Sequence, residues 1–287
     1  MPGAEDAKRS AAPRGPGSKL VLIGTPLGNR EDLSDRARRS LLEADLLLCE
    51  DTRSPQRLLP DTELPERISC FVGNEHERVA LLLDRLAAGQ TVAFVSEAGL
   101  PVWSDPGRLL VAAAVEAGYE VDVIPGPTAG TCALAVSGFL AEGARFLGFI
   151  ARGGKQRDEL LASLSSETGA VVIYEAGNRT PALLRDLSKH VGARRVLIAR
   201  ELTKLHQELI RGLATELAER ITEPLRGEVT VVIEGAAASE REHDPAREAA
   251  RAVLEVMTDP SLKPRARAKA LAELTGLDAR ELYDRLK

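Results

Sequence analysis

Three short segments combine glycine and proline with side chains that can bind a polar ligand. They are the turn 24–29 (GTPLGN), the longer segment 96–107 (SEAGLPVWSDPG) and the segment 125–129 (PGPTA). Glycine lets a backbone approach a ligand closely, and proline stiffens a turn. Each segment follows a short apolar run typical of a buried strand. Parallel α/β sheets bind ligands at the carboxyl ends of their strands, so these segments together predict one ligand site.

The chemistry of these segments favours a ligand that carries both an anionic and a cationic group. Backbone N–H groups of 96–107 can hold a carboxylate, and Asp105 can accept a hydrogen bond from an ammonium group. The segment 125–129 opens a helix, whose N-terminus favours an anion or an adenosine. Neither the GxGxxG fingerprint nor a P-loop is present at 24–29, which argues against a nucleotide phosphate there.

Four charged clusters also lie at predicted strand ends. Three follow strands, at 50–53 (EDTR), 174–179 (YEAGNR) and 200–204 (RELTK), and 226–228 (RGE) precedes one. Charged side chains at a strand end often do no more than face the solvent, but beside the Gly/Pro segments they indicate a cleft that accepts a polar substrate. The four histidines are scattered, with no HExxH spacing, and no GxSxG is present, so we expect neither a metal centre nor a serine hydrolase.

The strands and helices that flank these segments determine where they lie, and the sequence predicts an alternation of the two. Apolar runs predict strands at 20–24, 44–49, 92–95, 121–124, 145–150, 170–174, 196–199 and 229–233. Helical periodicity predicts helices between them, including one capped by Ser34, one over 128–138 and one capped by Thr180. This alternation predicts parallel sheets covered by helices on both faces.

Proline- and glycine-rich segments and shifts in composition along the chain predict its domain organisation. We expect a flexible tail over 1–18, an α/β domain over 19–127, a second α/β domain over 128–235, a linker over 236–245 and a helical module over 246–287. The last two helices of that module join at Thr275–Leu277 and resemble a helix-turn-helix pair with an excess of basic side chains. The module is either a surface that faces nucleic acid or an ordinary solvated helical hairpin.

Composition restricts the class of protein. The 287 residues are 44% hydrophobic and 28% charged, with a formal net charge of −5, so a nucleic-acid partner would need a local basic patch. No apolar run is long enough for a membrane span, and the polar first residues do not form a secretory leader. We therefore expect a soluble, cytoplasmic protein. The separated Cys49, Cys70 and Cys132 lie among apolar residues, which predicts buried, reduced thiols.

In this order and spacing, the seven segments resemble the tetrapyrrole methylase superfamily, and within it the branch that methylates small-subunit ribosomal RNA. The resemblance runs from about Lys19 to Gly235 and continues weakly through the C-terminal helices. It implies two α/β domains with S-adenosylmethionine in the cleft between them, commonly in a homodimer. It also implies methyl transfer to the ribose 2′-oxygen of a cytidine in the decoding region of 16S rRNA within the small ribosomal subunit.

The resemblance carries roles onto particular residues. The cofactor is expected to contact three segments, at Thr25, Pro26, Gly28, Asn29, Ser96, Ala98, Gly99, Pro101, Asp105, Pro106, Gly107, Gly126, Pro127, Thr128 and Ala129. The expected substrate contacts are Arg53, Tyr174, Glu175, Arg179 and Arg200, with Arg53 and Arg179 binding phosphates. The candidates for the group that assists proton removal are Glu50, Asp51, Glu201 and Lys204, and no single one is assigned. Lys204 fits that role only if its pKa is depressed.

Some positions depart from the family pattern. Gly24 replaces the usual proline, Glu97 and Leu100 replace Asp and Thr, and Gly177 and Asn178 replace Pro and His. Two alternatives therefore stay open beside the RNA methyltransferase. One is a methylase of a cyclic tetrapyrrole, and the other is a non-catalytic RNA-binding assembly factor that has kept the cleft.

Overall fold

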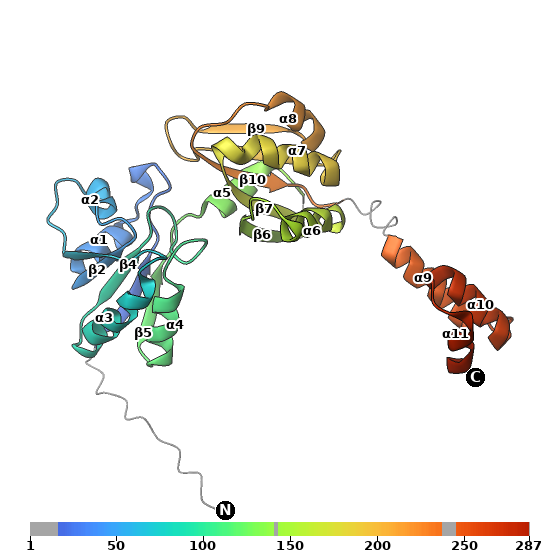
Figure 1. Ribbon diagram of the computed structural model, residues 1–287. Helices are drawn as coiled ribbons and strands as arrows, with labels where there is room; N and C mark the ends of the chain where they lie inside the picture. The colour runs from blue at the N-terminus through green and yellow to red at the C-terminus, as the bar shows by residue number, and fades with distance from the viewer. Residues whose placement is uncertain (1–16, 141–142, 237–244, 287) are drawn as a thin grey trace, which may run out of the picture.

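Two five-stranded sheets, each with helices on both faces, make up residues 19–233 (Figure 1). The computed structural model describes residues 17–140, 143–236 and 245–286, and for 245–248 the backbone alone. Residues 1–16 of the expected tail over 1–18, and most of the expected linker, lie outside the described residues. Among the described residues, no helix is both long and apolar enough to cross a membrane.

The first sheet is parallel throughout, as predicted. Its spatial order is β3-β2-β4-β1-β5. The strands are β1 (Lys19–Ile23), β2 (Leu46–Cys49), β3 (Glu66–Ser69), β4 (Val92–Val95) and β5 (Glu120–Ile124). All side chains of β2 and β4 are buried, because helices cover both faces of the sheet. The carboxyl ends of all five strands consequently meet at one edge.

Helices cover the two faces of this sheet with separate apolar clusters. α1 (Asp35–Glu43) packs Leu41 against one face, and Ser34 caps it by accepting from the Ala37 N–H, as predicted. α3 (Glu75–Ala87) and α4 (Arg108–Glu116) pack Leu82 and Leu110 against the other face. The short helix α2 (Ser54–Leu58) follows the charged segment 50–53.

The second sheet is mixed rather than parallel, which corrects the expectation from the strand-helix alternation. Its order is β6-β7-β10-β8-β9, and only β6 and β7 run parallel. The strands are β6 (Ala144–Phe149), β7 (Ala170–Ala176), β8 (Arg195–Arg200), β9 (Glu208–Leu213) and β10 (Glu228–Ile233). β8 and β9 form a hairpin with no helix between them, so their pairing is antiparallel.

α5 (Ala129–Ser137) covers one face of the second sheet, where Ala133 packs with Val172 and Leu197. The other face is covered by α6 (Lys155–Ser163), α7 (Thr180–Val191) and α8 (Ala214–Arg220). The prediction that Thr180 caps α7 is wrong. Thr180 is the first residue of the helix, and its hydroxyl donates to the Ala176 carbonyl instead.

The C-terminal helices are α9 (Pro245–Thr258), α10 (Pro264–Thr275) and α11 (Ala279–Arg285). Gly276 ends α10 with a φ of 70°, and Asp278 caps α11 by accepting from the N–H groups of Arg280 and Glu281. The Glu281 carboxylate pairs with Arg285 on the next turn of the helix.

Candidate functional site

A cavity of about 370 Å³ lies where the two sheets face each other. Segment 97–100, Trp103, Asp105 and Thr128 line it on one side, and Tyr174–Ala176 and segment 227–230 line it on the other. Its ionisable walls are acidic, at Glu50, Glu97, Asp105, Glu175 and Glu228. No Lys, Arg or His of the described chain is among its lining residues. We call this cavity the acidic pocket.

Backbone hydrogen bonds bring the three Gly/Pro segments together at the pocket. Thr25 and Gly99 exchange two bonds, with N···O distances of 2.9 and 3.1 Å. The Leu100 N–H donates to the Pro127 carbonyl at 3.0 Å. Gly99 has a φ of +79°, and a Cβ there would lie 3.1 Å from the Pro127 oxygen. Main-chain hydrogen bonds therefore hold the three segments together, and the backbone around Gly99 leaves little room for a side chain at that position.

The turn 24–29 also contacts the second sheet. The Asn29 N–H donates to the Thr203 hydroxyl at 3.2 Å, in the loop between β8 and β9. A Cβ on Gly28 would lie 2.3 Å from the Lys204 Cγ. Glu201 and Thr203 hold positive φ angles of 50° and 63°, which non-glycine residues rarely adopt. This loop is thus held in an unusual backbone conformation against the first sheet.

Lys204 and Glu201, both candidates for proton removal, bind each other. The Lys204 ammonium donates to Glu201 at 3.1 Å and to Glu228 at 2.9 Å. Burial lowers the pKa of Lys204, but the two carboxylates outweigh it and the pKa is raised. The Glu228 N–H and Lys204 together hold the pKa of Glu201 below its usual value. The geometry thus favours a charged, ion-paired lysine rather than the depressed pKa that a basic Lys204 requires.

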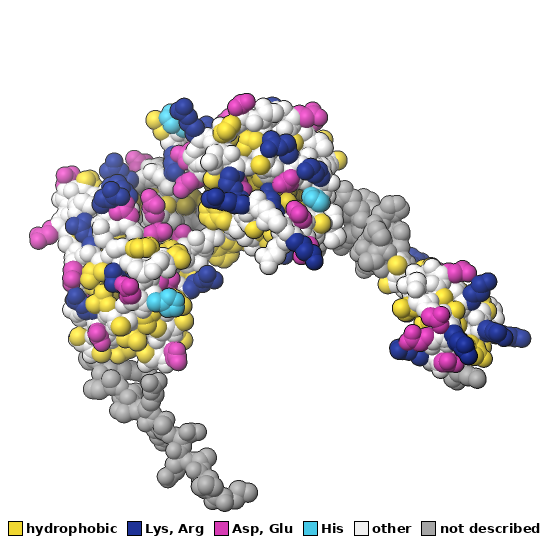
Figure 2. All heavy atoms as spheres, viewed as in Figure 1, with side chains coloured by type: hydrophobic (Ala, Val, Ile, Leu, Met, Phe, Trp, Pro, Cys, Tyr) yellow, Lys and Arg dark blue, Asp and Glu magenta, His cyan; other side chains and the backbone are white. Residues whose placement is uncertain are grey.

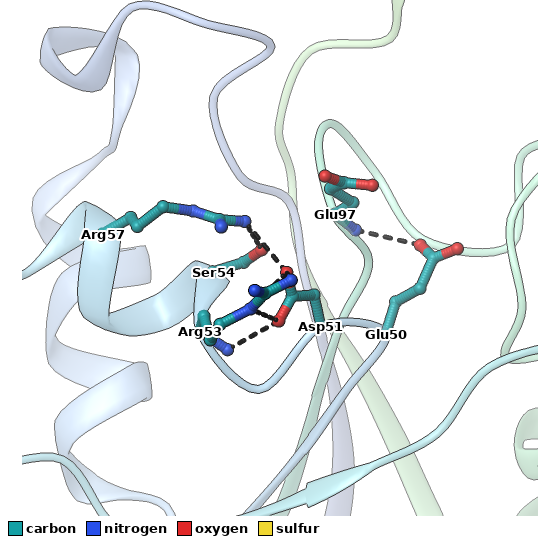
Figure 3. Close-up of polar contacts among 6 residues, drawn as sticks. All are labelled: Glu50, Asp51, Arg53, Ser54, Arg57 and Glu97. Carbon is teal, nitrogen blue, oxygen red and sulfur yellow. Dashed lines mark hydrogen bonds and ion pairs between the residues drawn. The ribbon is translucent and has the colours of Figure 1, made fainter.

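The segment 50–53 presents its two carboxylates differently (Figure 3). Asp51 accepts from Arg53 and Arg57, and the Arg53 hydrogen bonds hold the pKa of Asp51 well below its usual range. Glu50 points away from these arginines toward segment 96–107 and accepts from the Glu97 N–H at 3.0 Å (Figure 3). Glu50 lines the acidic pocket, and Asp51 does not.

A second cavity, of about 1240 Å³, adjoins the first and differs from it in charge. Its five basic lining residues, Arg30, Arg53, Arg57, Arg67 and Lys204, outnumber its acidic ones, which are Glu66, Glu97 and Glu228. Four residues line both cavities, namely Leu27, Glu97, Ala98 and Glu228. Dark blue and magenta side chains lie close together where the two sheets meet (Figure 2). We call this second cavity the basic groove.

Asp105 has the most perturbed carboxyl group of the acidic pocket. Burial raises the pKa of Asp105 to about 6, with Glu50, Glu228 and Glu97 adding to the rise and a hydrogen bond from Ser96 opposing it. A carboxyl group that titrates near neutral pH in a cleft is typical of a functional site. A cation beside Asp105 would favour its charged form and lower the pKa again.

Some predicted site residues support the pocket rather than line it. The predicted cofactor contacts that belong to the converging segments but do not line the acidic pocket are Thr25, Pro26, Gly28, Asn29, Ser96, Pro101, Pro106, Gly107, Gly126 and Pro127. Of these, Pro26 and Gly28 line the second cavity described above. Arg200 pairs with Glu208 at the β8–β9 hairpin. Arg179 pairs at 3.1 Å with Glu175, whose side chain is only 2% exposed, and also donates to the Ile150 carbonyl. These bonds engage the Arg179 guanidinium within the protein, and its contact with phosphate stays a prediction.

Several lining residues have no counterpart among the sequence predictions. They are Arg30, Arg57 and Arg67 in the basic groove and Trp103 and Phe149 in the acidic pocket. Trp103 could have been found, since it is the single tryptophan of the chain and stands in a polar loop. The arginines carry no such signal, because arginine is abundant along the whole sequence. Among the described residues, no cluster of His, Cys, Asp and Glu could hold a metal ion.

The family model of the tetrapyrrole (corrin/porphyrin) methylases matches residues 19–218. The chain belongs to this family. The ribosomal RNA small subunit methyltransferase I of Thermotoga maritima is 45% identical to it over 220 residues, which cover 76% of this chain and 98% of that relative. A relative of the same name from Synechocystis is 40% identical over 267 residues, or 92% of this chain and 95% of that one.

Solved methylases of the family share the fold. The methyltransferase CobJ superposes with a TM-score of 0.60 at 20% identity, over 77% of this chain and 95% of that chain. The uroporphyrin-III C-methyl transferase of Thermus thermophilus, complexed with S-adenyl homocysteine, gives 0.56 at 20% identity, over 76% and 97%. Like its named relatives, this tetrapyrrole methylase family member is a methyltransferase.

A buried carboxylate holds the segment 96–107 of this methyltransferase in place. Glu75, only 6% exposed, accepts from the N–H groups of Gly107 and Leu109 at 2.9 and 2.7 Å. It thereby caps α4, which has no side-chain cap of its own. We expect Glu75→Ala to lower the free energy of unfolding by about 1–3 kcal/mol, because two N–H groups lose their acceptor.

Urea unfolding measures this loss. Glu77→Ala is the matched control, since the Glu77 side chain on the same helix is 75% exposed. Glu75→Gln keeps an acceptor oxygen and should lose less stability than Glu75→Ala. Equal stability of Glu75→Ala and Glu77→Ala would contradict the capping role.

Proposed function

We propose that this protein transfers a methyl group from S-adenosylmethionine to the ribose 2′-oxygen of a cytidine in small-subunit ribosomal RNA. The observation that carries the proposal is the acidic pocket that opens into the basic groove. A sulfonium donor is cationic and RNA is polyanionic, so the two cavities match the two reactants in charge. The names of the relatives from Thermotoga maritima and Synechocystis support the RNA substrate.

The pocket residues fit the donor, which methyltransferases of this family use. A volume of about 370 Å³ is within the usual range for a small-molecule site. Asp105 would accept from the ammonium group, and the backbone of segment 97–100 would lie along the donor. Thr128 and Ala129, at the start of α5, would contact its nucleoside. When bound, S-adenosylmethionine supplies a methyl group activated by a positively charged sulfur.

The chain's own residues then orient the acceptor and take up its proton. A ribose hydroxyl is a weak nucleophile, so correct placement and a nearby base both raise the rate. Arg53 and Arg57 line the basic groove, where their charge favours RNA phosphates. Of the four candidates, we assign the base to Glu50, because it lines the acidic pocket while Asp51, Glu201 and Lys204 are ion-paired. The Glu97 N–H fixes one Glu50 oxygen.

The direct experiment is methyl transfer from labelled S-adenosylmethionine to assembled small ribosomal subunits that lack this modification. We expect the label on the 2′-oxygen of one cytidine in the decoding region, located by mass spectrometry of nuclease fragments. Transfer to a uroporphyrinogen or precorrin but not to RNA would instead make the protein a tetrapyrrole methylase. Donor binding without transfer to any of these would favour the assembly factor.

The role of Glu50 is tested by Glu50→Gln in the same assay. The amide still accepts from the Glu97 N–H but cannot take a proton, so we expect kcat to fall about 100- to 10,000-fold with little change in donor affinity. Glu43→Gln, an exposed position at the end of α1, serves as the control. Unchanged kcat in Glu50→Gln would remove Glu50 from the mechanism.

The role of Asp105 is tested by the pH dependence of donor binding. Because the pKa of Asp105 is raised to about 6, the carboxylate loses its charge as the pH falls through that value. We expect the calorimetric Kd for S-adenosylmethionine to rise between about pH 7.5 and about pH 5. Asp105→Asn should bind more weakly at pH 7.5 and show a flatter profile. Parallel profiles for the two proteins would contradict the proposed ammonium contact.

Three finer points belong to the same proposal. We place the reaction in the cytoplasm, on the assembled small subunit rather than on free RNA. We also propose a homodimer as the active form, in keeping with the family resemblance. Sedimentation equilibrium of the full chain distinguishes a dimer from a monomer.

A further inference from the structure

Aromatic side chains are scarce in this protein, yet several meet at the acidic pocket. The whole chain has five Phe, three Tyr and one Trp. Trp103 stacks on Phe146 with ring centroids 4.8 Å apart, Phe146 meets Tyr174 edge-on at 4.9 Å, and Tyr174 meets Phe149 at 5.7 Å. We call these four residues the aromatic wall. It joins a loop of the first sheet to two strands of the second.

A β-bulge in β6 places Phe149 on this wall. In a regular strand, residues three apart point to opposite faces of the sheet. The register between β6 and β7 shifts between Phe146 and Gly148, so that Phe146 pairs with Val172 and Phe149 pairs with Tyr174. Val172 and Tyr174 are two residues apart, so the bulge brings both phenylalanines to the same face. Bulges beside functional sites commonly redirect a side chain in this way.

Gly148 makes the bulge possible and links it to the first sheet. Its φ is +62°, a conformation that favours glycine, and a Cβ there would lie 2.8 Å from the Ser104 hydroxyl. Ser104 is the neighbour of Trp103 in segment 96–107. The bulge and the loop that carries Trp103 therefore fit against each other.

The two ends of the wall remain accessible, whereas its middle is supported. Trp103 is 43% exposed and Phe149 is 64% exposed, and both line the acidic pocket. Tyr174 is partly buried between them, and its hydroxyl accepts from the Gly130 N–H at 2.9 Å. Large aromatic side chains held rigidly but left exposed are typical of a surface that stacks against a ligand ring.

We propose that Trp103 and Phe149 stack against a nucleobase that leaves the RNA stack when its ribose enters the pocket. This inference rests on the proposed RNA substrate. The positive charge of the basic groove favours binding of the RNA phosphates. The groove shares four lining residues with the acidic pocket, so a nucleotide whose phosphate lies in the groove is close to the aromatic wall. Enzymes that modify a nucleotide commonly bind an unstacked base on aromatic side chains.

Paired substitutions test the wall. Trp103→Leu and Phe149→Leu keep apolar volume but remove the ring face, while Trp103→Phe and Phe149→Tyr keep a ring. We expect each leucine variant to raise the KM for small ribosomal subunits about tenfold and the ring-keeping variants to stay near wild type. The calorimetric Kd for S-adenosylmethionine should change less than about twofold, because the proposed donor contacts are segment 97–100, Asp105 and the start of α5 rather than these rings. Val115→Ala, an exposed position on α4, is the off-site control.

A loss of donor affinity with an unchanged KM for subunits would overturn the proposal, since the rings would then hold the donor. Unchanged values for both would also overturn it. Trp103 is the sole tryptophan, so its fluorescence reports on this wall in the unmodified protein. With saturating donor present, we expect oligocytidylate to quench it in wild type and less in Phe149→Leu. Quenching by oligocytidylate together with no methyl transfer to assembled small subunits would refute the proposed function alone, and no quenching at a saturating oligocytidylate concentration would refute the wall.

Discussion

Opposite charge on two adjoining cavities is the constraint on which the rest of the structure depends. Carboxylates line the acidic pocket, and four arginines with Lys204 line the basic groove beside it. Such charges would neutralise one another if the side chains were free to pair across the shared rim. Local bonds limit this, because Asp51 holds Arg53 and Arg57 within the groove, while Lys204 is already paired with Glu201 and with Glu228 of the shared rim. Within the part of the chain that the structure describes, neither Glu50 nor Asp105 forms an ion pair, and both line the pocket.

The pocket depends equally on main-chain contacts between segments that are distant in sequence. Backbone hydrogen bonds, between Thr25 and Gly99 and between Leu100 and Pro127, join three loops at the carboxyl edge of the first sheet. Glu75 fixes the far end of segment 96–107, and the β8–β9 loop meets the turn 24–29 from the second sheet. A parallel sheet supplies the common edge, and glycines allow the backbones to approach each other. The side chains that face a ligand are thus placed by a rigid frame.

Much of this frame could be predicted from sequence, because apolar runs and Gly/Pro segments are local signals. The strands that carried such runs lie within two residues of the expected ranges, and Ser34 caps α1 as expected. β3 and β9 are not predicted, since each is an edge strand with polar residues and no apolar run. The antiparallel pairing of β10 depends on contacts between distant residues, which no local pattern records.

The site was harder to predict at the level of single side chains. Glu50 and Asp51 are adjacent carboxylates with the same chemistry in the sequence, and only the fold shows that one faces the pocket and the other binds arginines. Arg179 is expected at an RNA phosphate but pairs with buried Glu175. Phe149 reaches the pocket through a one-residue register shift, which depends on the neighbouring strand. Such outcomes are set by three-dimensional contacts rather than by residue type.

The location of the bound donor tests the central claim most directly. A crystal structure with S-adenosylmethionine should show electron density in the acidic pocket, with the ammonium group beside Asp105 and the methyl group directed toward the rim shared with the basic groove. Density at another place, or an empty pocket at a saturating donor concentration, would contradict the account.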